Sequence, residues 1–511
     1  MEEVRTAVPQ IEWELFKRAC LPQVNQEHLD DLYSQLKVDG TLEDDTWRGF
    51  RSDSTEDEEH HYVPLIGCFN EVVAKSVALR NGGKPRIHAL LSENPHASYK
   101  PDIVAEVAKT RYVGGLDEGP AGYECDVVLL GEFEKSIKDR IVDENVSKIT
   151  ENSAQVMFND PTRRFFLGMT IECTTVRFWF FSRSHILVTH DLDLEANVKD
   201  IVYFIAALTN ATEEELGFDS SVRRVWYGGG IHYQYRIGGK TYQTVCMVSG
   251  SKASLVLGRG TRVWEVMEVL SGSGEPIQLG NQLFILKDLW IPEDAPTEKE
   301  VLDSIYERVN QYHDLGLDRS RFYDYFVKIE ACERICIRSM VDSNQLGLDS
   351  SMNFLREHMI PDDPQVFLLR RKKARSGSSS SSSGPVPPWE APIGALPGQF
   401  MPPGTPRIEL QTSGKRVHCR TLSERFGRAL HDILDHRPIL EAIIYIMTAI
   451  RYLYSAGYVH RDISTGNLLV ARVNDCVVCK LIDFEYAQDF TASPPGVQRK
   501  AISSLWTGTL S

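Results

Sequence analysis

A short stretch near the C-terminal end of the sequence carries an acid, an amide and a second acid that could support phosphoryl transfer. Asp462 follows His460-Arg461, Asn467 comes five residues later, and Asp483 comes sixteen residues after the asparagine. Phosphoryl transfer requires a protein mainly to position its reactants and to neutralise charge. We therefore predict that Asp462 accepts the proton of the acceptor hydroxyl. Asn467 and Asp483 would hold Mg²⁺ against the phosphates of ATP, because hard cations prefer oxygen ligands.

Two residues further upstream could bind the nucleotide. Lys287 ends a hydrophobic run typical of a strand, and we predict that its ammonium group meets the α- and β-phosphates. The next segment is typical of a helix and contains Glu298 and Glu300. Apolar residues three and four positions after Glu298 favour this residue as the one that faces the sheet and pairs with Lys287. Glu300 is the alternative partner.

A Gly-x-Gly sequence precedes the strand of Lys287. Gly258 and Gly260 would let backbone amides approach the phosphates, although Val263 stands where a third glycine is expected. An ordinary hairpin turn would have the same sequence. Their order before Lys287, Glu298 and Asp462 favours a role in ATP binding.

The elements that must position these residues follow from local patterns. Residues 223–290 contain several β-branched and aromatic runs separated by glycines, which indicates an antiparallel sheet. A helix is predicted at 296–312, and an apolar helix over 438–456 leads into the segment of Asp462. A strand is predicted between Asn467 and Asp483.

The N-terminal part has mixed elements of its own. We predict helices within 10–40, 69–79 and 197–208, and strands within 123–133 and 165–181, which together indicate an α/β domain. Pro101-Asp102 ahead of Gly131-Glu132-Phe133-Glu134 resembles the PD-(D/E)xK nuclease layout. Glu134 occupies the lysine position there, and Lys135 faces the other side of the strand, so we expect a degenerate nuclease-like fold without activity.

Composition divides the chain further. Residues 371–406 combine a basic run, six consecutive serines and a Pro/Gly-rich stretch, which predicts a disordered linker. We therefore expect an N-terminal α/β domain at 1–215, a strand-rich lobe at 216–370, the linker insert at 371–406 and a catalytic core at 407–511.

At four places the sequence resembles the fungal-type protein kinase domain family. They are Gly258-Arg259-Gly260-Thr261, Lys287-Asp288-Leu289-Trp290, His460 to Asn467, and Ile482-Asp483-Phe484-Glu485. The resemblance runs from about residue 215 to the end. It implies an α+β, bilobal protein-kinase-like fold, ATP and Mg²⁺ as cofactors, and phosphorylation of Ser/Thr hydroxyls in a protein substrate.

The sequence departs from the common kinase pattern in three respects. Ser464 replaces a lysine, Glu485 replaces the glycine after Asp-Phe, and the chain stops at Ser511, so we expect a truncated C-lobe. These departures keep a pseudokinase or scaffold that binds nucleotide without turnover as an alternative. A small-molecule kinase is a further alternative, because Ser464 to Asn467 is similar to aminoglycoside-phosphotransferase loops.

Charge and cysteine usage limit the class of protein. The 511 residues carry a net charge of −15, which argues against a nucleic-acid partner. The ten cysteines form no dense framework, and we find neither a signal peptide nor an apolar membrane span, so we predict an intracellular protein of the cytoplasm or nucleus. We expect Cys476 and Cys479 on a buried strand, Cys332 and Cys336 in the core face of a helix, and His60-His61 in a solvated loop.

Overall fold

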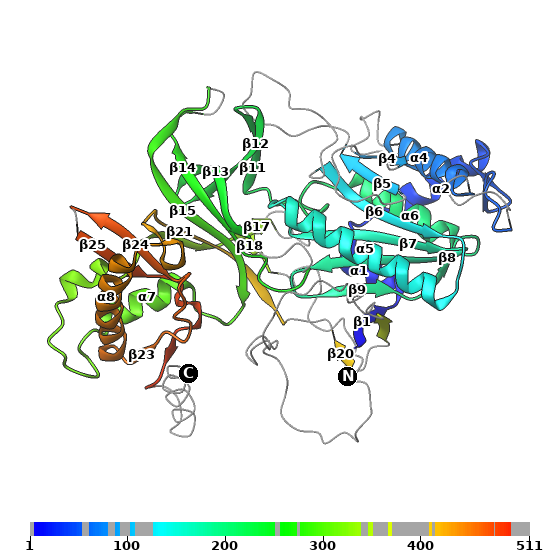
Figure 1. Cartoon of the computed structure of the whole chain (residues 1–511). Coiled ribbons are helices and arrows are strands. Elements are labelled where there is room, and N and C mark those ends of the chain that lie inside the picture. The colour runs from blue at the N-terminus through cyan, green and yellow to red at the C-terminus, as the bar shows by residue number, and fades with distance from the viewer. Residues whose placement is uncertain are drawn as a thin grey trace, which may run out of the picture. The chain divides into compact units, whose positions relative to one another are not determined.

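The computed structural model describes residues 5–53, 61–79, 87–91, 103–107, 126–250, 256–272, 276–338, 346–350, 366–369, 408–410, 414–474 and 476–491 (Figure 1). The chain divides into two compact units. The first comprises Met1–Ile231, Ser251–Gly260 and Cys336–Val417, and the second comprises His232–Gly250, Thr261–Ile335 and His418–Ser511. The units interleave along the sequence, whereas the sequence analysis expects contiguous domains.

A ten-stranded sheet forms the centre of the first unit. Its main order is β19-β1-β9-β8-β7-β6-β5-β4, while β10 pairs with β8 and β20 pairs with β1. The strands are β1 (Arg5–Ile11), β4 (Ile87–Leu91), β5 (Ile103–Val107), β6 (Val127–Glu134), β7 (Phe165–Glu172), β8 (Thr175–Ser182), β9 (Ile186–Thr189), β10 (Leu192–Asp193), β19 (Val366–Leu369) and β20 (Ile408–Leu410).

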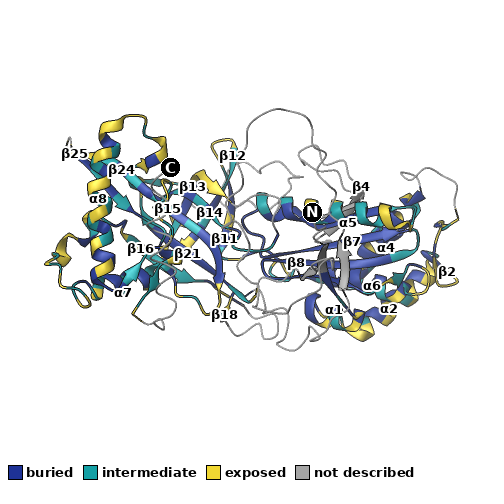
Figure 2. Cartoon of the chain, turned by 60° about the horizontal axis from the view of Figure 1, so that its bottom comes forward, coloured by how far each residue is buried: buried dark blue, intermediate teal, exposed yellow. Residues whose placement is uncertain are grey.

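Helices cover both faces of this sheet. They are α1 (Trp13–Cys20), α2 (Gln26–Val38), α4 (Val63–Ala78), α5 (Asp139–Asn159) and α6 (Val198–Asn210). On β7, Phe165 and Leu167 pack into the core shared with α1, α2, α4 and α6, whereas Phe166 packs into the core shared with α5. Because successive strand residues face opposite sides, a strand covered on both sides is apolar throughout, and β7 and β8 are buried along nearly their whole length (Figure 2).

The helix α5 is absent from the sequence prediction, although the sheet requires a connection of its kind. β6 and β7 are parallel neighbours, so the chain must cross over the sheet between them. The other predicted helices and strands of this part are confirmed as α1, α2, α4, α6, β6, β7 and β8, with α4 starting earlier than expected.

The second unit contains an antiparallel sheet with strands in the order β12-β13-β14-β15-β21-β16. The strands are β12 (Gly230–Ile237), β13 (Lys240–Gly250), β14 (Arg262–Val269), β15 (Leu279–Pro292), β16 (Ile329–Arg334) and β21 (Arg416–Glu424). The helix α7 (Glu298–Glu307) follows β15 in the chain and is shorter than predicted. Thus the strand of Lys287 leads directly into the helix of Glu298.

A second set of elements completes this unit. The predicted core helix is confirmed as α8 (His436–Ser455), and β24 (Leu468–Val473) and β25 (Cys476–Leu481) form a hairpin between Asn467 and Asp483. Short strands β22 (Arg428–Ala429), β23 (Tyr458–Val459) and β26 (Gln488–Asp489) pair locally. Side chains of α7, α8, β24 and β25 share one hydrophobic core.

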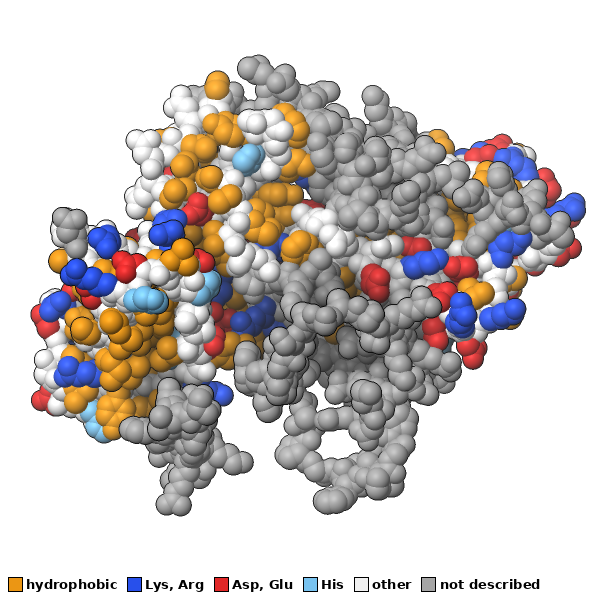
Figure 3. Space-filling view, viewed as in Figure 1, with side chains coloured by type: hydrophobic (Ala, Val, Ile, Leu, Met, Phe, Trp, Pro, Cys, Tyr) orange, Lys and Arg blue, Asp and Glu red, His pale blue; other side chains and the backbone are white. Residues whose placement is uncertain are grey.

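One face of α8 is apolar and exposed. Leu440, Ile444 and Met447 are 65%, 68% and 57% exposed, and hydrophobic side chains gather over this helix in Figure 3. These positions lie one helical turn apart, so they form a continuous stripe on the surface.

None of the helices in the described ranges has the length and apolar character needed to cross a membrane.

The prediction of a helix at Cys332 and Cys336 is wrong. Cys332 lies in β16, which hydrogen-bonds with β21, and Cys336 lies in β17 (Cys336–Arg338), which pairs with β18 (Leu346–Leu348). Pairing with strands distant in the sequence overrides the local pattern here. The expectation of a solvated loop is wrong for His61, whose side chain is buried. The predicted linker at 371–406, Pro101-Asp102 and His60 lie outside the described residues.

Candidate functional site

A pocket of about 630 Å³ in the second unit brings together most of the predicted site residues. Its walls come from β13, β14, β15, α7, β21, β24 and the segment after β25. Lys287, Glu298, Asn467 and Asp483 all line it. Asp462 is joined to the pocket through Asn467.

Lys287 lies at the centre of a group of carboxylates. Its Nζ atom is 2.7 Å from Asp483 Oδ1, 3.5 Å from Glu298 Oε2 and 4.0 Å from Glu485 Oε2. Burial alone would lower the pKa of Lys287, but the charges of Glu298, Asp483 and Glu485 outweigh that effect and raise the pKa. The lysine therefore stays an ammonium ion that can bind phosphate.

The two candidate glutamates of α7 have different partners. Glu298 faces Lys287, whereas Glu300 pairs with Arg334 and closes a capping box with Thr297 at the start of the helix. The carboxylate of Glu298 also accepts hydrogen bonds from the backbone amides of Asp483 and Phe484, at 3.1 and 3.3 Å. One side chain thus connects α7, Lys287 and the segment of Asp483.

The segment of Asp483 is held in an unusual conformation by its neighbours. Asp483 has a φ of 67°, in the left-handed region that non-glycine residues rarely adopt. The next residue, Phe484, is buried against the rings of Phe326 and His460. This anchoring turns the Asp483 carboxylate toward Lys287 and the pocket.

Asp462 and Asn467 form a compact loop. The Asn467 amide group donates to the backbone oxygen and the carboxylate of Asp462, at 2.9 and 3.0 Å. The backbone amide of Ile482 donates to the backbone oxygen of Asn467, and the His460 ring contacts the backbone oxygen of Ile482. Burial lowers the pKa of His460, so this ring is neutral near pH 7 and serves as an uncharged support.

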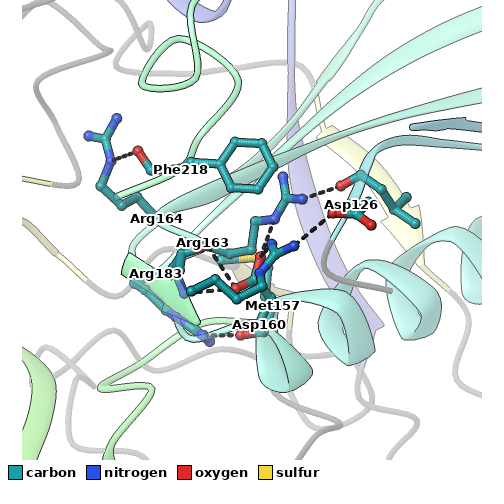
Figure 4. A network of polar contacts seen from close by, with 10 residues as sticks. Asp126, Met157, Asp160, Arg163, Arg164, Arg183 and Phe218 are labelled. Atoms are coloured by element: carbon teal, nitrogen blue, oxygen red, sulfur yellow. Dashed lines mark hydrogen bonds and ion pairs between the residues drawn. The ribbon is translucent and has the colours of Figure 1, made fainter. Parts of the chain in front are cut away.

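Gly258 and Gly260 do not line this pocket. They belong to the first unit, where the Gly258 amide donates to the backbone oxygen of Arg183. The Arg183 guanidinium donates in turn to the backbone oxygens of Val256 and Met157, within the network drawn in Figure 4. A Cβ atom at Gly260 would lie only 2.6 Å from Arg183 Nε, so a glycine is required for this close approach.

Oxygen atoms suited to Mg²⁺ are present in the pocket. Asn467 and Asp483 supply an amide and a carboxylate, which are the ligand types that Mg²⁺ accepts. Within the described ranges, no group of three His, Cys, Asp or Glu side chains is arranged to hold a metal. The two residues fit a magnesium ion whose other ligands are phosphates and water, as is usual for this ion.

The carboxylates that resemble nuclease positions are engaged by the helix α5. Asn152 donates to Glu132 Oε1 at 2.6 Å, and Lys148 Nζ lies 2.7 Å from Glu134 Oε1. Asp102, the third residue of that layout, lies outside the described residues.

The contact of Glu485 with Lys287 was not predicted. In the sequence Glu485 stands out only as a departure from the glycine after Asp-Phe. An acidic residue in place of a glycine, close to the predicted magnesium ligand Asp483, was the sequence feature that could have indicated a role for Glu485. The sequence could not show that Glu485 lies near Lys287, because the two residues are nearly 200 positions apart.

A comparison with known families identifies a match. The family model described as fungal protein kinase matches residues 117–510, well over half of the chain. The match begins about a hundred residues before the expected start of the resemblance. It therefore includes β6 to β9, α5 and α6 of the first unit as well as the second unit.

Proposed function

Because the chain belongs to the fungal protein kinase family, we propose that it transfers the γ-phosphoryl group of ATP to serine and threonine hydroxyls of proteins. The observation that carries this proposal is the meeting of Lys287, Glu298, Asn467 and Asp483 in one pocket. These residues come from β15, α7 and two later segments, and their chemistry matches the requirements of phosphoryl transfer.

Each residue then has a distinct role. Lys287 binds the α- and β-phosphates, and Glu298 keeps its ammonium group in place. Asp462 accepts the proton of the protein hydroxyl, and Asn467 orients the Asp462 carboxylate through its amide hydrogen bond. Mg²⁺, held by Asn467 and Asp483, would neutralise charge on the phosphates when bound. Gly258 and Gly260 stay predicted phosphate-binding residues, and the Gly258 amide donates to the backbone oxygen of Arg183.

The substitution Asp462→Asn tests this assignment. It removes the proton acceptor and leaves Lys287 and Asp483 in place, so kcat for phosphorylation of dephosphorylated casein should fall at least about 10²-fold. Binding of Mg·ATP, measured by isothermal titration calorimetry, should change little. Equal turnover by the two proteins would contradict the role of Asp462.

A nucleotide-binding protein without turnover is the second candidate. The contact that favours it is the 2.7 Å ion pair of Lys287 with Asp483. In this pair the residue proposed to bind phosphate and a residue proposed to bind Mg²⁺ are bonded to each other. Under this alternative Mg·ATP raises the melting temperature of the protein, yet the wild type and Asp462→Asn transfer no phosphate.

We place the reaction in the cytoplasm or nucleus. The cysteines of the described ranges are all free thiols, which is usual for proteins in a reducing compartment. The protein substrate, and its recognition by residues outside the pocket, are open to direct assay.

A further inference from the structure

Two thiols meet on neighbouring strands of the second unit. Cys332 lies in β16 and Cys419 in β21, and the strand register places them diagonally, since Cys332 is opposite Thr421 and Cys419 is opposite Arg334. Their sulfur atoms are 3.8 Å apart. Cys419 is buried, whereas Cys332 is partly exposed. A disulfide needs the two sulfurs about 2.05 Å apart, so its formation requires both side chains to turn and the two strands to move closer together.

The strand of Cys332 contacts the start of α7. Arg334, two residues after Cys332 on β16, pairs with Glu300 of α7 and donates to the backbone oxygen of Ala295 just before the helix. A change in the position of β16 can therefore reach the first turn of α7.

Two polar groups contact the Cys332 sulfur. Thr421 Oγ1 lies 3.3 Å from it and the Cys419 sulfur 3.8 Å from it. The Cys419 thiol contributes most and, with the Thr421 hydroxyl, lowers the pKa of Cys332 against the effect of burial, whereas the pKa of Cys419 is raised by this same hydrogen bond and by burial. Because Cys332 is also the more exposed of the two, it is the nucleophile of the pair and Cys419 is the protonated partner.

Another cysteine of the same sheet provides a contrast. Cys246 in β13 is more exposed than Cys332, but its sulfur lies 3.4 Å from a carboxylate oxygen of Glu265. Desolvation and this carboxylate raise the pKa of Cys246. Exposure alone would make Cys246 the more reactive thiol, whereas the surroundings of the two sulfurs favour Cys332.

We propose that Cys332 and Cys419 form a peroxide-sensitive dithiol, in which oxidation links β16 to β21 next to the start of α7. The Cys332 thiolate attacks one oxygen of a hydroperoxide, the O–O bond breaks, and Cys332 becomes a sulfenic acid. With hydrogen peroxide the leaving hydroxide takes up a proton and departs as water. Cys419 then loses its proton and attacks the Cys332 sulfur, so that an S–S bond replaces the S–O bond and a second water leaves.

The link changes the helix that carries Glu298. The disulfide draws β16 toward β21, and Arg334 of β16 is bonded to Glu300 and to the Ala295 backbone oxygen at the start of α7. Glu298 is the first residue of α7 and contacts Lys287 and the segment of Asp483. We expect affinity for Mg·ADP to fall about threefold in the oxidised protein. This consequence rests on the proposed function, whereas the dithiol chemistry does not.

Peptide mapping of the full chain tests the chemistry. The reduced protein is treated with hydrogen peroxide, its remaining thiols are alkylated, and the digest is analysed by mass spectrometry. We expect a peptide pair linked through Cys332 and Cys419 that dithiothreitol separates.

Cys419→Ser should instead hold Cys332 as a sulfenic acid that dimedone labels, while Cys246→Ser should form the same link as the wild type. Labelling of Cys246 before Cys332, or absence of the linked pair in a natively folded wild type, would overturn the proposal.

Calorimetry with Mg·ADP separates the regulatory consequence from the proposed function. Weaker binding by the oxidised wild type, restored by dithiothreitol and absent in Cys419→Ser, supports the link to α7. Equal binding by the linked and reduced forms overturns that link. If the linked pair forms but neither form binds Mg·ADP, the dithiol is supported and the proposed function is contradicted.

Discussion

Three carboxylates, those of Glu298, Asp483 and Glu485, lie within 4.0 Å of the Lys287 Nζ atom. The side chains of Lys287 and Glu485 are only 16% and 14% exposed, so solvent screens their charges incompletely. A divalent cation beside Asp483 would therefore be attracted by the nearby charge of Glu485, which gives Glu485 a part in the proposed magnesium binding without requiring it to be a ligand.

Neutralising Glu485 should make magnesium binding weaker. In Glu485→Gln the Mg²⁺ concentration for half-maximal ADP binding should rise on the order of fivefold, about 1 kcal/mol, because one nearby charge is lost. Calorimetric titration of ADP at a series of Mg²⁺ concentrations measures this shift. Glu300→Gln is the matched control, since Glu300 pairs with Arg334 and lies away from Lys287. An unchanged magnesium requirement in Glu485→Gln would refute the argument.

At the scale of elements, α7 connects the sheet to the segment of Asp483. Its start is defined by a capping box, in which the Thr297 hydroxyl accepts from the Glu300 amide and the Glu300 carboxylate accepts from the Thr297 amide. The first residue after the cap is Glu298, which contacts Lys287. The position of this carboxylate therefore depends on an intact helix N-terminus.

Thr297→Ala should lower both stability and nucleotide affinity. Loss of the cap costs about 1 kcal/mol, and fraying of the first turn moves Glu298 away from Lys287. Urea unfolding followed by circular dichroism gives the first quantity, and calorimetry with Mg·ADP gives the second. Thr448→Ala in α8, where the hydroxyl bonds only within its own helix, should leave ADP affinity unchanged. Equal affinity in Thr297→Ala would show that Glu298 does not depend on the cap.

At the scale of the whole molecule, one buried histidine predicts acid sensitivity. Burial lowers the pKa of His185 to about 4, below the ordinary value near 6.5. The unfolded chain therefore binds more protons than the folded protein between these values. The stability that the folded protein gains from keeping His185 neutral is fully present above pH 6.5 and is lost as the pH falls toward 4.

The free energy of unfolding should thus fall between pH 7 and pH 5 by roughly 2 kcal/mol through His185 alone. Urea unfolding of the wild type and His185→Gln at both pH values isolates this contribution, because the variant lacks the titrating ring. His190→Gln, at a partly exposed position, should retain the wild-type pH dependence. Identical pH dependence in His185→Gln and the wild type would contradict the burial argument.

The segment at 371–406 connects two parts of the chain that contribute strands to the same sheets. β19 before the segment and β20 after it both pair with β1, and β21 lies between β15 and β16. Each fragment of a chain cut in this segment would keep its strand pairing with the other. The covalent connection is therefore not needed to hold the fragments together.

Trypsin should cut first near Arg371–Arg375, where the sequence predicts a basic, disordered linker. The two fragments should elute together in gel filtration without denaturant and separate in urea, because the strand pairing persists after the cut. Denaturing electrophoresis of the eluted peak identifies both fragments. Separation of the fragments without denaturant would contradict the strand arrangement.

The sequence alone was sufficient to predict which chemical groups the candidate site contains. Asp462, Asn467 and Asp483 lie close together along the chain, so their types and spacing carry the signal without knowledge of the fold. The helices α7 and α8 and the hairpin of β24 and β25 were also predictable, because their apolar periodicity is a local property.

Only the tertiary structure decided which distant residues meet. Strand alternation determines which face a residue occupies, but it does not determine which strand becomes its neighbour. For this reason the sequence did not reveal the contact of Glu485 with Lys287, the pairing of Cys332 with Cys419, or the attachment of Gly258 to Arg183. Local patterns thus determined the elements and the chemical groups, whereas long-range packing decided their partners.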